Sequence, residues 1–222
     1  MSIVSECIQN SLPIWEACLN TDFLQKMGND TLNENCFKGY IVDDSLYLRE
    51  YAKVFAWGMT KALDMDTVRT YYSMLSFVNE SEGATRLRYL DRYGLTDSKI
   101  QRLPQRPANK AYTNFMIQAA RNGSGTAECM MVSLPCMLSY GWIFQRLLER
   151  FPAVRKTPYW PLVQDYAGGP YDSVCREWSA FADHTCAGSS AEQRRYYKRL
   201  FREASLHELR FWQMSESPRE DI

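Results

Sequence analysis

Apolar residues recur along this chain at helical spacing. After Thr31 they return on one helix face, at Phe37, Tyr40, Ile41, Leu48, Ala52 and Phe55. The same periodicity predicts further helices at roughly 4–19, 65–93, 108–121, 125–150, 171–185 and 191–214. No stretch alternates apolar and polar residues between hairpin turns, as strands would. The pattern therefore predicts an all-α protein.

Capping signals mark where two of these helices begin. Thr31 and Glu34 have the spacing of a capping box before the second helix. Ser189 and Glu192 repeat that spacing before the last helix. Between them, the two prolines of the linker at 101–109 separate a pair of helices.

The length and composition of the chain indicate a single domain. The 222 residues are enough for a sizeable core, and 45% hydrophobic with 23% charged residues is typical of globular proteins. No repeat, low-complexity segment or change of composition divides the sequence. We therefore expect a single-domain helical bundle over 1–222, structured from about 5 to 215 and ending in a short tail.

Charge and cysteine usage exclude several kinds of partner. Lys and Arg number 26, as do Asp and Glu, and no basic stripe with interleaved aromatics predicts nucleic-acid binding. The longest uncharged stretch, Cys129–Phe144, is shorter than the roughly 20 residues of a membrane helix and predicts a buried core helix. Seven cysteines without a Cys-x-x-Cys pair, beside two histidines, argue against a disulfide framework or a zinc site. With no secretory signal at the N-terminus, we expect a cytoplasmic protein without metal or membrane.

Asp44 is the first candidate for chemistry. It lies inside the second helix, on the same face as Tyr40, Tyr47 and Tyr51. One interpretation is that the carboxylate and the phenols point together into the bundle. The other is that Asp43 and Asp44 form a solvated edge and that the tyrosines only pack.

Cys136 and Glu208 are the other two candidates. Cys136 follows Pro135 inside an apolar helix, with Tyr140 one turn later. Proline removes a backbone donor, and such an irregularity can aim the next side chain into a cavity. Most buried cysteines are nevertheless inert core thiols, so that alternative stays open. Glu208, among apolar and aromatic residues, is either half-buried with a raised pKa or faces solvent.

Five segments of the sequence match one family in order. The longer ones are Phe37–Val54, Leu134–Tyr140 and His207–Met214. The shorter ones are Ala111–Thr113 and Asp165–Gly169. Each is weak alone, but five in order, one of them with a Leu-Pro-Cys core, are specific. Over nearly its whole length, the chain resembles the TenA family, the thiaminase II or aminopyrimidine aminohydrolase proteins.

The resemblance implies a heme-oxygenase-like helical bundle without heme, with its pocket inside. It implies a hydrolase without a cofactor that acts in thiamin salvage. Such an enzyme cleaves the C–N bond at the exocyclic methylene of 4-amino-5-aminomethyl-2-methylpyrimidine, or of thiamin, to give hydroxymethylpyrimidine. The resemblance also implies a homotetramer whose small-molecule partner is a pyrimidine.

The resemblance also assigns residues to roles. Cys136 matches the nucleophile, Glu208 the general acid/base, and Asp44 the partner of the ring's amino edge. The positions that line the pocket match Tyr47, Tyr112, Tyr140 and Tyr166. A thiolate that adds to an electron-poor pyrimidine needs a ring nitrogen protonated at the same time, which requires a carboxylic acid nearby. Flat aromatic walls suit a flat substrate and keep water from the adduct.

Two positions depart from the family pattern. Arg88 follows Leu87 where relatives often have a histidine, and His207 stands where they often have an aromatic residue. Both departures leave open which pyrimidine the protein prefers, thiamin or the aminopyrimidine.

Other functions on the same scaffold are less well matched. A heme oxygenase needs an iron-ligating histidine near the N-terminus, and no histidine precedes His184. A di-iron carboxylate protein needs Glu-x-x-His pairs, which the sequence lacks. A cofactorless oxidase of the quinone-biosynthesis type does not require Cys136. The remaining alternative is a non-catalytic pyrimidine-binding or regulatory bundle, which has little reason to keep a cysteine, a glutamate and an aspartate together.

Overall fold

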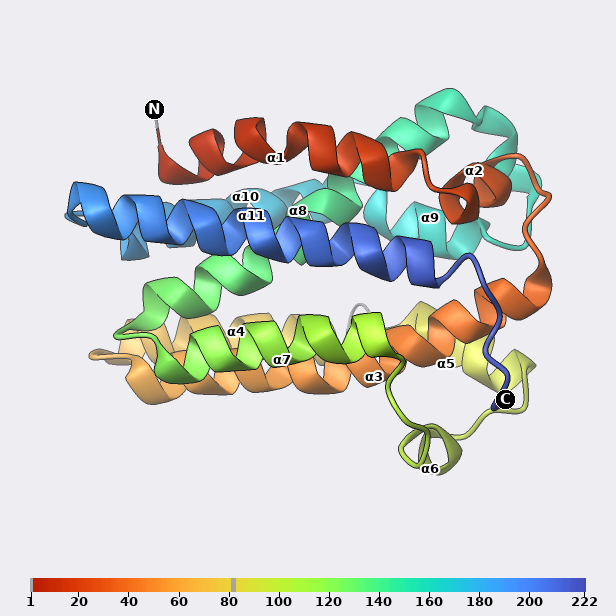
Figure 1. Cartoon of the computed structure of the whole chain (residues 1–222), viewed down its shortest axis with the longest axis horizontal. Helices are drawn as coiled ribbons and strands as arrows, with labels where there is room; N and C mark the ends of the chain where they lie inside the picture. Colours follow the sequence, from red (N-terminus) through yellow and green to blue (C-terminus); the bar gives the residue numbers. More distant parts are fainter. Residues whose placement is uncertain (1, 81–82) are drawn as a thin grey trace.

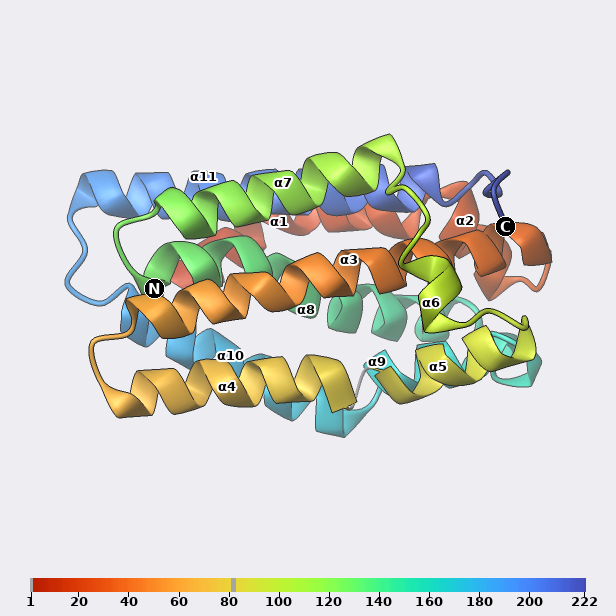
Figure 2. The same ribbon diagram turned by 90° about the horizontal axis from the view of Figure 1, so that it is seen from below.

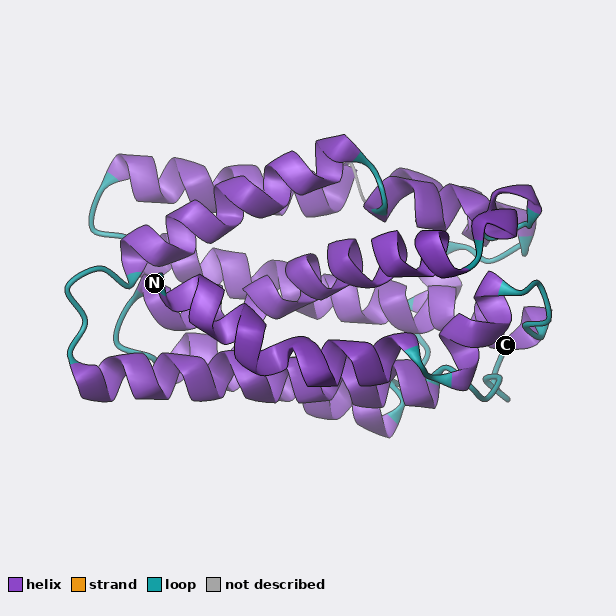
Figure 3. Ribbon diagram, turned by 90° about the horizontal axis from the view of Figure 1, so that it is seen from above, coloured by secondary structure: helices purple, strands orange, loops and turns teal. Residues whose placement is uncertain are grey.

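The computed structural model describes residues 2–80 and 83–222, and every regular element in that part of the chain is a helix (Figure 3). The expected all-α fold class is confirmed. The longer helices are α1 (Ile3–Leu19), α3 (Glu34–Lys61), α4 (Met65–Glu80), α5 (Gly83–Arg92), α7 (Pro107–Asn122), α8 (Thr126–Arg150), α10 (Gly169–Thr185) and α11 (Ala191–Met214). The short ones are α2 (Asp22–Gly28), α6 (Asp97–Ile100), the 3₁₀ helix η1 (Pro152–Lys156) and α9 (Trp160–Tyr166). The short helices were not predicted, because an element of two turns or fewer is too short to show a period.

One predicted helix is two in the structure. The sequence predicted a single helix over 65–93, whereas α4 ends at Glu80 and α5 begins at Gly83. Residues 81 and 82 lie outside the described part of the chain. Glycine is a poor helix former, which fits a boundary at Gly83 better than an uninterrupted helix.

Both helices are capped by a residue other than the predicted one, and only the second cap is a reciprocal capping box. Asn33, not Thr31, caps α3, and its side chain accepts a hydrogen bond from the backbone N–H of Asn35. Ser190, not Ser189, caps α11 in a reciprocal box with Gln193. The predicted helix starts are nevertheless close, because each capping residue lies within two positions of the predicted one.

The long helices run along one axis, with α8 through the middle of the bundle. Figure 1 shows α1 beside α11 on one side and α3 beside α7 on the other. Figure 2, seen from below, shows α4 followed by α5 along one edge. Because α8 packs against α11, α3, α7, α10 and α1, residues on its different faces meet side chains from most of the bundle. The two termini lie at opposite ends of the long axis.

The central helix α8 is long and apolar enough to cross a membrane by length and composition. However, 89% of its most apolar window is buried inside the protein, as in the core helix of a soluble protein. The prediction of a buried core helix at Cys129–Phe144 is therefore confirmed. Pro135 lies inside this helix, which is continuous from Thr126 to Arg150.

Candidate active site

Five helices carry the predicted site residues. Asp44 and Tyr47 lie on α3, while Tyr112 lies on α7 and Glu208 on α11. The others are Cys136 and Tyr140 on α8 and Tyr166, the last residue of α9. Because α8 contacts α3, α7, α9 and α11, these side chains can meet inside the bundle. The contacts below show that the structure brings all seven together.

Glu208 is almost completely buried, with 2% of the residue exposed. The hydroxyl of Tyr112 donates a hydrogen bond to its Oε1 atom at 2.7 Å. Burial raises the pKa of Glu208 to about 7, although hydrogen bonds with the side chains of Tyr112 and Cys136 act to lower it. The solvent-facing alternative is therefore wrong. A carboxyl that titrates near neutral pH has the proton affinity that a general acid/base needs.

Cys136 is one of two cysteines that are only half-buried, the other being Cys175. Its side chain hydrogen-bonds with that of Glu208. After burial, the charges of Glu208 and Cys136 are the largest causes that raise the pKa of Tyr112, so the three groups lie close together. Cys129, two turns earlier on α8, differs because burial raises the pKa of its thiol to about 12. The thiol of Cys136 is thus more accessible than that of Cys129 and has a more polar environment.

Asp44 lies inside the bundle, and the alternative of a solvated edge is wrong. Asp44 is 8% exposed, and its neighbour Asp43 is fully buried. Burial raises the pKa of Asp44 to about 6, while the charge of Arg86 lowers it and that of Asp43 raises it. Asp44 also raises the pKa of Glu208. The two predicted carboxyls therefore interact electrostatically, each with a pKa above its ordinary value.

The predicted tyrosines form aromatic walls around these groups. The ring centroids of Tyr47 and Tyr112 are 5.0 Å apart, as are those of Tyr140 and Tyr166. Burial raises the pKa of Tyr47, Tyr112 and Tyr140 well above the ordinary value, so these phenols stay protonated and can donate hydrogen bonds. The walls are thus flat, apolar surfaces with hydroxyl groups at their edges.

Three aromatic residues that the sequence did not assign to the site complete these walls. Trp212 stacks on Tyr40 with ring centroids 5.4 Å apart, and it lies 5.1 Å from Tyr140. Phe211 packs edge-on against Tyr47 at 5.9 Å. A signal for each of them was present, because Phe211 and Trp212 follow Glu208 by three and four residues and so share its helix face, and Tyr40 shares the face of Asp44.

His207 reaches the site through Tyr112. The imidazole ring stacks on Tyr112 with centroids 5.3 Å apart and an angle of 6° between the planes. The hydroxyl of the same tyrosine donates to Glu208. The spacing of His207 and Glu208 did not pair them, because adjacent helical residues do not share a face, and in the structure Tyr112 lies between them.

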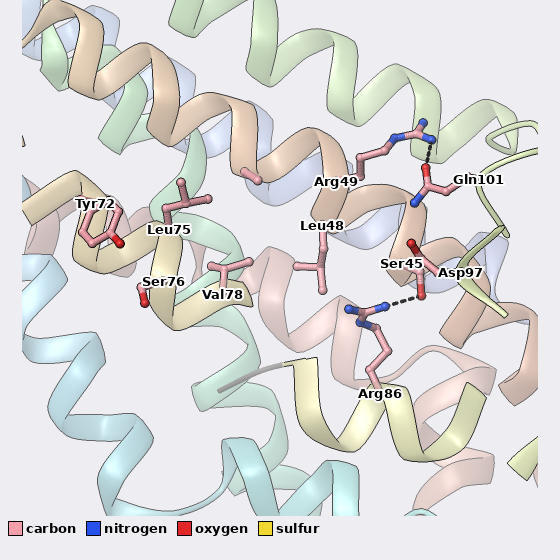
Figure 4. Close-up of a pocket in the computed structure, with 11 residues that line it drawn as sticks. Ser45, Leu48, Arg49, Tyr72, Leu75, Ser76, Val78, Arg86, Asp97 and Gln101 are labelled. Atoms are coloured by element: carbon pink, nitrogen blue, oxygen red, sulfur yellow. Dashed lines mark hydrogen bonds between the residues drawn. The ribbon is translucent and has the colours of Figure 1, made fainter. Parts of the chain in front are cut away.

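A separate cleft of about 510 Å³ lies among α3, α4, α5 and α6 (Figure 4). Its lining includes none of the seven predicted site residues. Arg86 links it to the site, because its Nη1 atom donates to Ser45 Oγ at 2.9 Å while its charge lowers the pKa of Asp44. Arg86 could not be recognised from the sequence, because no residue spacing relates α5 to α3.

The assembled groups can support nucleophilic addition to a flat heteroaromatic ring. A thiol lies beside a carboxyl that titrates near neutral pH, and a second carboxyl and several phenols interact with these groups. Such a set can add a thiolate to a ring carbon while protonating a ring nitrogen. Within the described residues, no group of three or more His, Cys, Asp or Glu side chains is placed to hold a metal ion.

Comparison with known proteins gives one consistent family. The model of the TENA/THI-4/PQQC family matches residues 8–217. The aminopyrimidine aminohydrolase of Helicobacter pylori is 30% identical over 97% of this chain and 99% of its own, and that of Halalkalibacterium halodurans is 27% identical over 99% and 97%. The structure of a TenA homologue from P. horikoshii OT3 superposes with a TM-score of 0.84 at 24% identity, covering 97% of this chain and 98% of that one. The chain therefore belongs to the TENA/THI-4/PQQC family, as its resemblance to TenA proteins predicted.

Proposed function

We propose that this protein hydrolyses 4-amino-5-aminomethyl-2-methylpyrimidine to hydroxymethylpyrimidine and ammonia, with thiamin as a second substrate to be ranked against it. The observation that carries the proposal is the Cys136 thiol in hydrogen-bonding contact with Glu208, whose pKa is about 7. The relatives named aminopyrimidine aminohydrolase, which match nearly the whole chain, support a TenA-type hydrolase of thiamin salvage.

The proposed reaction begins with the two groups that touch. The Cys136 thiolate adds to a carbon of the pyrimidine ring, and the carboxylic acid of Glu208 gives its proton to a ring nitrogen. The electron pair gained by the ring then expels the amine from the exocyclic methylene, which leaves as ammonia after taking up a proton. Water adds to that methylene, and the C–S bond breaks to restore the aromatic ring and the thiolate. The net change is one water consumed and one ammonia released.

Asp44 and the tyrosines orient the ring in this proposal. The Asp44 carboxylate accepts a hydrogen bond from the amino group on the ring, which positions the pyrimidine relative to Cys136. Tyr47, Tyr112, Tyr140 and Tyr166 stack around the ring and exclude water from the adduct. Because the hydroxyl of Tyr112 already donates to Glu208, it fixes the carboxyl that protonates the ring.

The test is ammonia release from the aminopyrimidine by purified protein, with thiamin in parallel. Cys136→Ser is expected to abolish turnover while leaving the fold intact by circular dichroism. Cys129→Ser, on the same helix but buried in the core, is the matched control and is expected to keep turnover. Turnover that survives in Cys136→Ser would refute the nucleophile. Binding of the pyrimidine without any ammonia from the wild type would favour the alternative, a non-catalytic pyrimidine-binding or regulatory bundle.

The family resemblance adds two parts to the proposal. We expect a cytoplasmic homotetramer whose ligand is a small pyrimidine, with neither nucleic acid nor membrane as a partner. Light scattering coupled to size-exclusion chromatography measures the oligomeric state, and a monomer at micromolar concentration would exclude the homotetramer. Four large apolar side chains, those of Leu63, Met65, Tyr72 and Leu87, are exposed on the isolated chain and are available for contacts between subunits.

A further inference from the structure

A buried cluster of charges lies next to Asp44. Asp43 is fully buried, and two guanidinium groups bind its carboxylate: Arg106 Nε donates to Oδ2 at 2.7 Å, and Arg219 Nη1 donates to Oδ1 at 2.6 Å. Arg219 also binds both oxygens of Asp221, at 2.8 and 2.7 Å. We call these four residues the Asp43 cluster. Two negative and two positive charges balance within it.

The Asp43 cluster joins the three helices that carry Asp44, Tyr112 and Glu208. Asp43 precedes Asp44 on α3, and Arg106 is the N-cap residue of α7, the helix of Tyr112. Arg219 belongs to the tail that follows α11, the helix of Glu208. The carboxylate of Asp43 on α3 thus receives hydrogen bonds from the segment that leads into α7 and from the segment that follows α11.

Further hydrogen bonds hold the same three segments together. Arg106 Nη1 donates to the backbone carbonyls of Met214, at the end of α11, and Ser217, both at 2.9 Å. Arg219 Nη2 donates to the carbonyl of Pro104 at 2.8 Å, in the linker before α7. Asn109, in the first turn of α7, donates its Nδ2 to the backbone carbonyl of Asp43 at 2.8 Å.

The C-terminal tail packs directly on α3. A Cβ atom at Gly39 would lie 3.2 Å from the backbone nitrogen of Arg219, so the glycine allows this close approach. One turn earlier, the thiol of Cys36 donates to the carbonyl of Glu216 at 3.2 Å. The side chain of Arg219 is only 1% exposed, although it is only three residues from Ile222. The tail is therefore an ordered part of the bundle.

Buried ion pairs contribute little net stability, because the cost of desolvation offsets the attraction between the charges. Their geometry is specific, however, since a guanidinium fork fixes the direction of each hydrogen bond. Burial raises the pKa of the Asp43 carboxyl, and both guanidinium groups lower it. The buried carboxylate of Asp43 therefore has partners of fixed direction on two other segments of the chain.

We propose that the Asp43 cluster is a positioning device, in which Arg219 and Arg106 set the spacing of Asp44, Tyr112 and Glu208 around the substrate. The inference rests on the proposed function for the roles of those three residues. Arg219 and Arg106 touch no reacting atom; they act through α3, α7 and α11. The tail beyond α11 then belongs to the active-site framework, although no sequence motif marks it.

The test compares Arg219→Ala with Glu220→Gln, an exposed neighbour in the same tail. Assays are run well below the melting temperature of each variant, so that loss of folded protein does not contribute. Arg219→Ala is expected to lower kcat for the aminopyrimidine about 10- to 100-fold, with KM changed far less, because small displacements of catalytic groups cost that much. Glu220→Gln is expected to match the wild type. Arg219→Lys keeps the charge but loses the fork; it is expected to be intermediate and replaces the alanine variant if that one does not fold.

A second readout does not depend on turnover. Because Glu208 hydrogen-bonds with Cys136, a displaced Glu208 changes how the alkylation rate of Cys136 depends on pH. The midpoint is expected to shift in Arg219→Ala and not in Glu220→Gln. An inactive wild type would refute the proposed function and leave this readout to decide the inference. A variant with a lower Tm but wild-type kcat, KM and alkylation profile would show that the Asp43 cluster only stabilises the fold.

Discussion

The seven thiols of this protein differ in how easily they ionise. Burial raises the pKa of Cys7 and of Cys129 to about 12, which leaves almost no thiolate at neutral pH. Cys136 is half-buried and hydrogen-bonds with Glu208, and we predict that it reacts fastest with iodoacetamide near pH 7. Mass spectrometry of peptides after brief alkylation measures all seven together. Equal rates at all of them would contradict the prediction.

Arg86 is the charge outside the site that most affects Asp44. Its attraction lowers the pKa of Asp44, against the effect of burial. We predict that Arg86→Gln raises that pKa by about 0.5 to 1 unit, so the acid limb of the pH profile of kcat/KM moves to higher pH. Arg88→Gln, an exposed arginine two residues later, is the control and is expected to leave the limb in place. An unmoved limb in Arg86→Gln would mean that Asp44 does not control it.

At the scale of the helices, the elements that could be predicted from the sequence are those whose apolar residues repeat regularly. Apart from α4 and α5, which were predicted as one helix, the long helices were placed within a few residues, because each buries one face and its apolar residues therefore repeat. Asp44, Cys136 and Glu208 were proposed as site residues through short motifs that resemble a family. Spacing alone left a purely structural interpretation open for each of them. Arg106, Arg219 and Arg86 were not found, because their partners lie on other segments and a single sequence does not record such contacts.

The packing of α3 against α4 gives a prediction at this scale. A Cβ atom at Gly58, on α3, would lie 2.3 Å from the ring of Tyr71, so the two helices must separate to accept it. We predict that Gly58→Ala lowers the free energy of unfolding by about 1 to 3 kcal/mol. Gly169→Ala, at the start of α10, meets no atom within 4 Å and is expected to be neutral or slightly stabilising. Urea unfolding measures the free energy of unfolding of both variants. Equal values would show that α3 and α4 accommodate the methyl group without loss of stability.

At the scale of the whole molecule, the bundle buries several carboxyl groups, three of which lie at or beside the candidate site. Asp43, Asp44 and Glu208 are all buried, and burial raises the pKa of each. Only Asp43 is bound by guanidinium groups from other segments, while the other two face the candidate site. Among the described residues, no guanidinium group forms a salt bridge with Asp44 or Glu208, so the fold buries two carboxyls without a cationic partner where the proposed chemistry needs them. Such a conflict between stability and function is common in active sites.

The raised pKa of Glu208 makes the free energy of unfolding depend on pH. The pKa of Glu208 is about 7 in the folded protein and near its ordinary value of 4.5 in the unfolded chain. Between these values the folded state holds a proton that the unfolded state has lost, so the stabilisation is complete below pH 4.5 and disappears as the pH rises through 7. From pH 5 to pH 8, this one group is expected to lower the free energy of unfolding by about 3 kcal/mol.

Glu208→Gln removes this titration and separates the two roles of the residue. Urea unfolding at pH 5 and pH 8 is expected to show a smaller loss of stability in the variant than in the wild type, because glutamine has no proton to lose. The remaining loss includes the contribution of Asp44, whose pKa of about 6 is also raised by burial. The same variant is expected to lower kcat by about 10²- to 10⁴-fold, since the general acid is gone. If both proteins lost equal stability, Glu208 would not titrate near neutral pH, and the acid in the proposed mechanism would have to be another group.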